Sequence, residues 1–167
     1  INEKTISYYQ LGTFIGNLTK ALESFSDAHA KRIFPWDINN IDFLKKHSKL
    51  FKAEKEERII SHFIKEFEKN ILPNKNLLRK SIIHNDCNDH NVLLNEKGHI
   101  SGIIDFGDMA HTFLVGELAI AITYLILEEE DPLEKIKAVV RGYQSIMPLR
   151  EEEIESLIYL ICIRACM

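Results

Sequence analysis

The stretch that decides the fold covers residues 82–108 and reads IIHNDCNDHNVLLNEKGHISGIIDFGD. Asp86 follows a short apolar run and lies five residues before Asn91. Asp105 ends a second apolar run and is followed by Phe and Gly. Two motifs, H-x-D-x-x-x-x-N and D-F-G, therefore occur in this order, each at the edge of an apolar segment. Their combination is far more specific than either motif alone.

A β-hairpin is predicted between the two motifs. Residues 91–95 predict a strand, residues 96–98 its turn, and residues 99–105 the returning strand. Asn91 at the start of one strand and Asp105 at the end of its antiparallel neighbour should lie at the same end of the ribbon. Asp86, in the loop just before the hairpin, would then face the same pocket from the side.

This pattern is typical of phosphoryl transfer. The protein must position a hydroxyl group and neutralise the charge on the phosphates with Mg²⁺. Because Mg²⁺ prefers oxygen ligands, Asn91 and Asp105 are the predicted metal ligands. Asp86 is the predicted catalytic base, which orients the acceptor hydroxyl and takes its proton. His84 is predicted to support the loop through a hydrogen bond.

The same stretch resembles the aminoglycoside phosphotransferase and choline kinase group of small-molecule kinases, which have a protein-kinase-like fold. Within that group it looks most like the hydroxylysine kinase subfamily, and three further segments share this similarity, at residues 12–22, 34–37 and 116–124. Two positions depart from the pattern. Asn85 stands where the family often has Gly, and Glu117 stands where relatives more often carry Asp.

The resemblance implies transfer of the γ-phosphate of ATP or GTP to an alcohol such as hydroxylysine, an amino-alcohol or an aminoglycoside, with Mg²⁺ as cofactor. It also implies an acceptor pocket between the catalytic loop and the surrounding helices, where acidic residues hold a substrate amine. Carboxylates and an aromatic face both suit an ammonium group. The substrate-binding candidates are Asp89, Trp36, Asp37 and Glu117. Asp89 is the strongest of them because it lies in the same loop as the predicted base. Trp36 equally suits a core anchor.

A kinase of this fold also has an N-terminal lobe with a phosphate-covering loop, a strand lysine and a helix glutamate. No segment before residue 84 matches these features, and the only upstream glycines, Gly12 and Gly16, lie in an amphipathic helical pattern. We therefore expect residues 1–167 to be the C-terminal lobe alone, with the N-terminal nucleotide lobe missing and the isolated fragment inactive. A start at Ile1 and an end at Met167 within an apolar run fit a fragment.

The rest of the chain is predicted to be helical, from the three- and four-residue spacing of its apolar positions. The expected helices cover residues 7–25, a short segment ending near 47, and residues 59–71, 115–127, 132–148 and 150–167. Gly12 and Gly16 are expected to allow close helix packing. In the last helix a core role is expected for Leu157, Ile158, Leu160 and Ile161. The fold class is therefore α+β, mainly α-helical.

The composition of the chain limits the number of domains, the partners and the cellular setting that we expect. The 167 residues, 46% of them hydrophobic, suit one compact domain. The net charge is -4 and basic residues are interspersed with glutamates, so no nucleic-acid partner is predicted. No apolar run reaches membrane-spanning length, so no membrane partner is predicted. The three cysteines form no paired pattern and indicate a reduced, cytoplasmic setting. Cys87 has no surrounding signature of a nucleophile.

Three other interpretations remain open. The run N-D-C-N-D-H-N is compatible with a polar loop that only joins two strands. A cluster of histidines and aspartates is compatible with a zinc or two-metal hydrolase, and its members would be His84, Asp86, Asp89 and His90, with His99 or His111. That cluster lacks the usual His-x-His start. The last interpretation is a non-catalytic kinase-like fragment or binding module.

Overall fold

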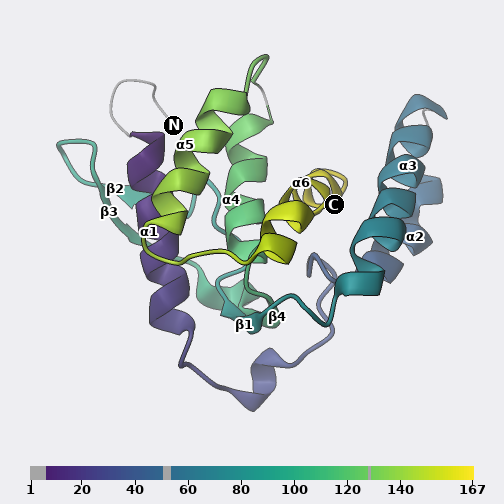
Figure 1. Cartoon of the computed structure of the whole chain (residues 1–167), viewed down its shortest axis with the longest axis horizontal. Helices are drawn as coiled ribbons and strands as arrows, with labels where there is room; N and C mark the ends of the chain where they lie inside the picture. The colour runs from purple at the N-terminus through teal and green to yellow at the C-terminus, as the bar shows by residue number, and fades with distance from the viewer. Residues whose placement is uncertain (1–6, 51–53, 128) are drawn as a thin grey trace.

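The computed structural model describes residues 7–50, 54–127 and 129–167. The predicted class, α+β and mainly α-helical, is confirmed (Figure 1). Within these ranges, short 3₁₀ turns interrupt the connections at four places. The regular elements are α1 (Tyr8–Leu22), α2 (Ile41–His47), α3 (Glu54–Asn70), β1 (Lys80–Ile83), β2 (Val92–Leu94), β3 (Ile100–Ile103), β4 (Ala110–Phe113), α4 (Gly116–Ile126), α5 (Leu133–Gln144) and α6 (Glu151–Ala165).

Helix α1 lies along α5 because glycines bring the two backbones together (Figure 1). A Cβ atom added to Gly12 would lie 1.9 Å from the carbonyl oxygen of Val139, and one added to Gly142 would lie 2.0 Å from that of Tyr9. The predicted role of Gly12 and Gly16 in close packing is confirmed. Gly142, the reciprocal glycine on α5, was not singled out from the sequence.

Helix α4 forms the centre of the core. Its residues 116–123 are all buried. It packs against α1, α5, α6 and β4. This position matters for function because the N-terminal turn of α4 meets the loop that follows β1.

Strands β2 and β3 form the predicted hairpin. Val92 pairs with Ile103, and a bulge lies between Leu93 and Leu94. Gly98 turns the chain with a φ of 75°, a conformation that glycine adopts without strain. The backbone N–H of Ile104 donates to the carbonyl oxygen of Asn91 at 3.0 Å, so the two ends of the hairpin close on each other.

A second antiparallel ladder joins β1 to β4, with Ile83 opposite Ala110. This pairing was not predicted, because A-H-T-F carries no clear alternation of apolar and polar residues. An ion pair between half-buried Arg79 and buried Glu153 attaches the ladder to α6. Arg79 donates from Nε and Nη2 to the carboxylate of Glu153, at 2.8 and 2.6 Å. Burial raises the pKa of Glu153, but the hydrogen bonds from Arg79 and from the backbone of Arg150, together with the charge of Arg79, outweigh burial and the pKa is lowered.

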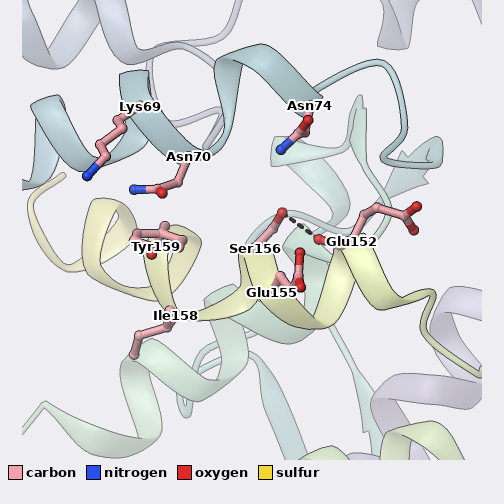
Figure 2. Close-up of a pocket in the computed structure, with 8 residues that line it drawn as sticks. All are labelled: Lys69, Asn70, Asn74, Glu152, Glu155, Ser156, Ile158 and Tyr159. Carbon is pink, nitrogen blue, oxygen red and sulfur yellow. Dashed lines mark hydrogen bonds between the residues drawn. The ribbon is translucent and has the colours of Figure 1, made fainter.

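Helices α2 and α3 lie together at one side of the molecule, and α3 packs against α6 (Figure 1). In α6, Leu157, Leu160 and Ile161 are buried as predicted, but the core prediction for Ile158 is wrong, since 55% of its surface is exposed. One residue along a helix rotates the side chain by about 100°, which takes Ile158 off the buried face. It lines a cavity of about 400 Å³ between α3 and α6 (Figure 2). No helix in the described ranges has the length and apolar character needed to cross a membrane.

We predict that Gly12→Ala lowers the free energy of unfolding by about 2–3 kcal/mol, because the new methyl group would force α1 and α5 apart. Urea denaturation of the purified chain measures this change. Gly102→Ala is the matched control, since a Cβ there has no neighbour within 4 Å, and its effect should stay within about 0.5 kcal/mol. Equal stability of the two variants would contradict the close-packing account.

Candidate active site

The two ladders bring the predicted site residues together. The loop that leaves β1 and the loop that enters β4 lie at the same end of one ladder, because Ile83 pairs with Ala110. Asn91 and Ile104 close the corresponding end of the hairpin. The loop at residues 84–91 and the loop at residues 104–109 therefore face each other, and together they carry all three residues predicted for catalysis and metal binding.

The carboxylate of Asp86 is held by donors on both oxygens. Its Oδ2 accepts hydrogen bonds from Nδ2 of Asn91 at 2.8 Å and Nδ2 of Asn88 at 3.1 Å. Its Oδ1 lies 3.4 Å from Nη2 of Arg164. One fifth of the side chain is exposed. Asp86 is thus a fixed carboxylate that remains reachable from solvent, as a general base must be.

Asn91 and Asp105 offer oxygen atoms suited to a hard cation. Nδ2 of Asn91 donates to the backbone oxygen and to Oδ2 of Asp86, both at 2.8 Å, so this amide nitrogen makes both side-chain bonds. Oδ1 of Asn91 has no bonded donor within the described ranges. Asp105 is exposed, and only its Oδ1 accepts a bond, from the N–H of Gly107 at 3.3 Å. This donor set fits Mg²⁺, which takes one or two protein oxygens and completes its shell with phosphate and water.

His84 joins the two loops. It is fully buried, its Nε2 donates to the carbonyl oxygen of Ile104 at 2.9 Å, and its Nδ1 accepts from the N–H of Asp86 at 3.3 Å. Burial lowers the pKa of His84, and the neutral ring fits one donor and one acceptor nitrogen. Phe106 packs edge-on against the ring at 4.8 Å. This arrangement is what a loop-supporting histidine requires.

Asn85 adopts a left-handed backbone conformation with a φ of 68°. Glycine takes this conformation freely, and asparagine is among the few other residues that tolerate it. The side chain is buried, and its Nδ2 donates to the carbonyl oxygen of Asp108 at 3.1 Å. Asn85 therefore satisfies the backbone requirement of this position and adds a second link between the two loops.

Glu117 supports the loop from the first turn of α4. Its side chain is fully buried, and Oε2 accepts the backbone N–H of His84 at 2.6 Å. Oε1 has no hydrogen-bond partner in the part of the chain described. Burial raises the pKa of Glu117 to about 7, although the bond from His84 opposes the rise. The substrate-binding role predicted for Glu117 stays a prediction, and the structure gives the carboxylate a contact within the protein.

The other substrate-binding candidates lie in different settings. Asp89 is exposed in the catalytic loop, with Oδ1 4.0 Å from Nε2 of His90. Trp36 is 42% exposed and packs edge-on against Phe43. Asp37 is buried, and its Oδ1 accepts from Oγ1 of Thr112 on β4. Exposure keeps Asp89 and Trp36 available to a ligand, whereas the carboxylate of Asp37 is already bonded inside the fold.

Two arginines at the site were not identified from the sequence. Arg164 reaches Asp86 from α6, and Nη2 of Arg32 donates to the carbonyl oxygens of Gly107 and Met109 at 2.6 and 3.2 Å. Both contacts join residues more than 70 positions apart. A single arginine in a helix or loop carries no local signal of such a partner, so only the fold reveals them.

The structure also shows the surroundings of the histidines considered for a metallohydrolase site and of Cys87, considered as a nucleophile. Within the described ranges, no three His, Cys, Asp or Glu side chains converge as a metal site. Both ring nitrogens of His84 are already engaged, and His90 is 90% exposed. Cys87 is buried, and burial raises the pKa of its thiol well above the usual range, which opposes formation of a nucleophilic thiolate.

We predict that Glu117→Gln removes a pH dependence of stability. The folded-state pKa of about 7 exceeds the ordinary value of 4.5, so the contribution of Glu117 is full below about pH 4.5 and is lost as the pH rises to about 7. The free energy of unfolding of the Gln variant, relative to wild type, should therefore rise by up to about 3 kcal/mol across this interval.

Denaturant unfolding of both proteins at several pH values tests this expectation. Glu155→Gln, an exposed change on α6, is the matched control and should show no such trend relative to wild type. A constant difference between wild type and Glu117→Gln from pH 4.5 to 7 would contradict the assignment of a protonated, buried carboxyl group.

Comparison with known proteins shows which family the chain resembles. Residues 6–154 match the model of the phosphotransferase enzyme family. Hydroxylysine kinase of Xenopus laevis is 35% identical over 92% of this chain and 45% of its own length. Hydroxylysine kinase of Mus musculus is 31% identical over 98% of the chain and 48% of its own length. The chain thus spans about half the length of these relatives.

Two solved structures share the fold. One is the amicoumacin kinase hAmiN in complex with AMP-PNP, Ca²⁺ and Ami, with a TM-score of 0.66 and 16% identity over 94% of this chain and 48% of that one. The other is the macrolide 2'-phosphotransferase type I, with a TM-score of 0.66 and 14% identity over 99% and 53%. The family model, the hydroxylysine kinase relatives and the loop geometry agree, and the chain belongs to the phosphotransferase enzyme family.

Proposed function

We propose that the complete protein containing this chain is a small-molecule kinase that transfers the γ-phosphate of ATP or GTP to an alcohol. The observation that carries the proposal is the carboxylate of Asp86, bonded to Asn91 at the base of the hairpin whose other strand leads to Asp105. Membership of the phosphotransferase family supports it. The same three residue types, in this order, serve phosphoryl transfer in kinases.

Each residue has a defined role in the proposal. Asp86 accepts the proton of the acceptor hydroxyl while that oxygen bonds to the γ-phosphorus and the bond to the bridging oxygen of the nucleotide breaks. Asn91, through Oδ1, and Asp105, through its carboxylate, hold Mg²⁺. When bound, Mg²⁺ neutralises charge on the phosphates. His84 keeps the loop in place through its bonds to Ile104 and Asp86.

Hydroxylysine is the proposed acceptor, ahead of amino-alcohols and aminoglycosides, because the two relatives described above are hydroxylysine kinases. We assign recognition of an ammonium group of this acceptor to Asp89 and Trp36, because both side chains are exposed. Asp37 and Glu117, predicted as further contacts, are kept as supports of the pocket, since both are buried and bonded within the protein.

We further propose that residues 1–167 are the C-terminal lobe and that transfer requires an N-terminal nucleotide lobe. The length of the relatives supports this division, because the chain matches less than half of each. The chain alone is then a binding module without activity. The free cysteines Cys87, Cys162 and Cys166 are consistent with a cytoplasmic setting.

We predict that Asp86→Asn in the complete protein lowers kcat by about 10³-fold or more and leaves the Kd for Mg-nucleotide within about threefold, because the base acts only in the chemical step. Asp105→Asn should instead weaken Mg-nucleotide binding by about 10–100-fold. Transfer is measured with ATP and GTP against hydroxylysine, choline, ethanolamine, homoserine and an aminoglycoside, and binding by calorimetry.

Asp131→Asn, at an exposed position after α4, serves as the matched control and should keep wild-type values. Transfer that survives both Asp86→Asn and Asp105→Asn would overturn the assignment of the site. Binding of Mg-nucleotide without transfer to any acceptor would favour the non-catalytic alternative.

A separate prediction concerns Asp89. Asp89→Asn should raise KM for an ammonium-bearing acceptor by about tenfold, the effect of losing one charged contact of about 1.4 kcal/mol. The value of kcat and the KM for the nucleotide should stay within about twofold. An unchanged KM for the acceptor would remove Asp89 from the pocket.

A further inference from the structure

Arg164 reaches from the last turn of α6 into the loop that carries Asp86. Only 6% of its side chain is exposed. Nη1 donates to the carbonyl oxygen of Trp36 at 2.9 Å, and Nη2 donates to the hydroxyl of Tyr124 at 3.0 Å. The same Nη2 lies 3.4 Å from Oδ1 of Asp86. Four segments that are distant in sequence therefore meet at one guanidinium group.

Burying a guanidinium is unfavourable unless it is paired and hydrogen-bonded. Asp86 is the carboxylate that pairs with Arg164, and no second one does so within the described ranges. Trp36 and Tyr124 contribute neutral acceptors, and the Tyr124 ring lies 5.5 Å from the guanidinium carbon. These contacts fix the direction of the Arg164 side chain, so that its guanidinium charge faces Asp86.

The two oxygens of Asp86 are held from different sides. Amides of its own loop bind Oδ2, and Arg164 faces Oδ1. The distance of 3.4 Å exceeds the 2.7–2.9 Å usual for a charge-assisted bond. Arg164 therefore faces the carboxylate through one long bond, and Oδ1 keeps a lone pair that can accept a proton from an incoming hydroxyl.

Helix α4 supports this arrangement at both ends. Glu117 in its first turn binds the backbone of His84, and Tyr124, two turns later, binds Arg164. Helix α4 packs against α6, so the position of the carboxylate depends on the contact between these helices. Misplacing a reacting group by about 1 Å is enough to cost about 100-fold in rate.

We propose that Arg164 is the positioning residue of the base Asp86, and that the packing of α6 on α4 sets the geometry of phosphate transfer. This inference rests on the proposed function. It assigns to α6 a role in the chemical step that is separate from metal binding and from nucleotide binding.

The test compares steady-state kinetics of Arg164→Met, Arg164→Lys, Asp86→Asn and the double variant Asp86→Asn/Arg164→Met in the complete protein. Arg164→Met should lower kcat by about 10–100-fold and leave both KM values within about threefold. Arg164→Lys restores the charge without the fork of donors, so its kcat should lie between the two. In the Asp86→Asn background the Met substitution should cost less than about twofold, because the group it positions has gone.

Two further variants complete the test. Arg141→Met is the matched control and should keep wild-type kcat, since Arg141 is exposed and, within the described ranges, its side chain bonds only to its own helix α5. Tyr124→Phe removes the hydroxyl that orients Arg164 without changing charge. It should lower kcat by about 3–10-fold, and it decides the question if Arg164→Met does not fold.

Three results would overturn the inference. The first is a wild-type kcat in folded Arg164→Met, or in Tyr124→Phe if the Met variant does not fold. The second is an effect of Arg164→Met that is confined to the KM for the acceptor. The third is an equal loss of kcat when Arg164→Met is made in the wild-type and in the Asp86→Asn background. Absence of transfer by the wild-type protein to every acceptor would defeat the proposed function itself, and the role of Arg164 with it. These failures are distinguishable because the last is seen before any variant is made.

Discussion

The buried ring of His84 is the constraint on which the rest of the site depends. One nitrogen donates to Ile104 at the end of the hairpin, and the other accepts from the backbone of Asp86. The backbone N–H of His84 is in turn bound by Glu117. These three bonds hold the base loop, the metal loop and helix α4 in fixed relation. Because both ring nitrogens are used, the neutral tautomer is the form that fits.

Among the residues that the structure describes, several at the site have an unfavourable backbone conformation or an unpaired buried oxygen, and the packing of the core compensates for this. Asn85 and Asp105 have positive φ angles, and buried oxygens of Glu117 and Asn85 lack bonded partners within the described ranges. Such costs concentrate at functional sites, where the surrounding structure holds an otherwise unfavourable arrangement in place. Here that structure is α4, whose first eight residues are buried and which packs against α1, α5 and α6.

The features predicted from sequence are those set by neighbouring residues. The hairpin and the arrangement of Asp86, Asn91 and Asp105 around it follow from strand alternation, a turn containing Gly98 and two motifs within 27 residues. The pairing of β1 with β4 and the contacts of Arg32 and Arg164 depend on segments that only tertiary packing brings together. The core prediction for Ile158 was wrong for a related reason. The spacing of apolar residues alone does not show that Ile158 lies outside the buried face of α6.

The most direct test of the account is a crystal structure of the complete protein with Mg²⁺ and a non-hydrolysable ATP analogue. We expect the metal to be bound to Oδ1 of Asn91 and the carboxylate of Asp105, with Asp86 off the metal and directed toward the acceptor side. Metal held by Asp86 together with His84 or His90, or a nucleotide bound away from the hairpin, would contradict it.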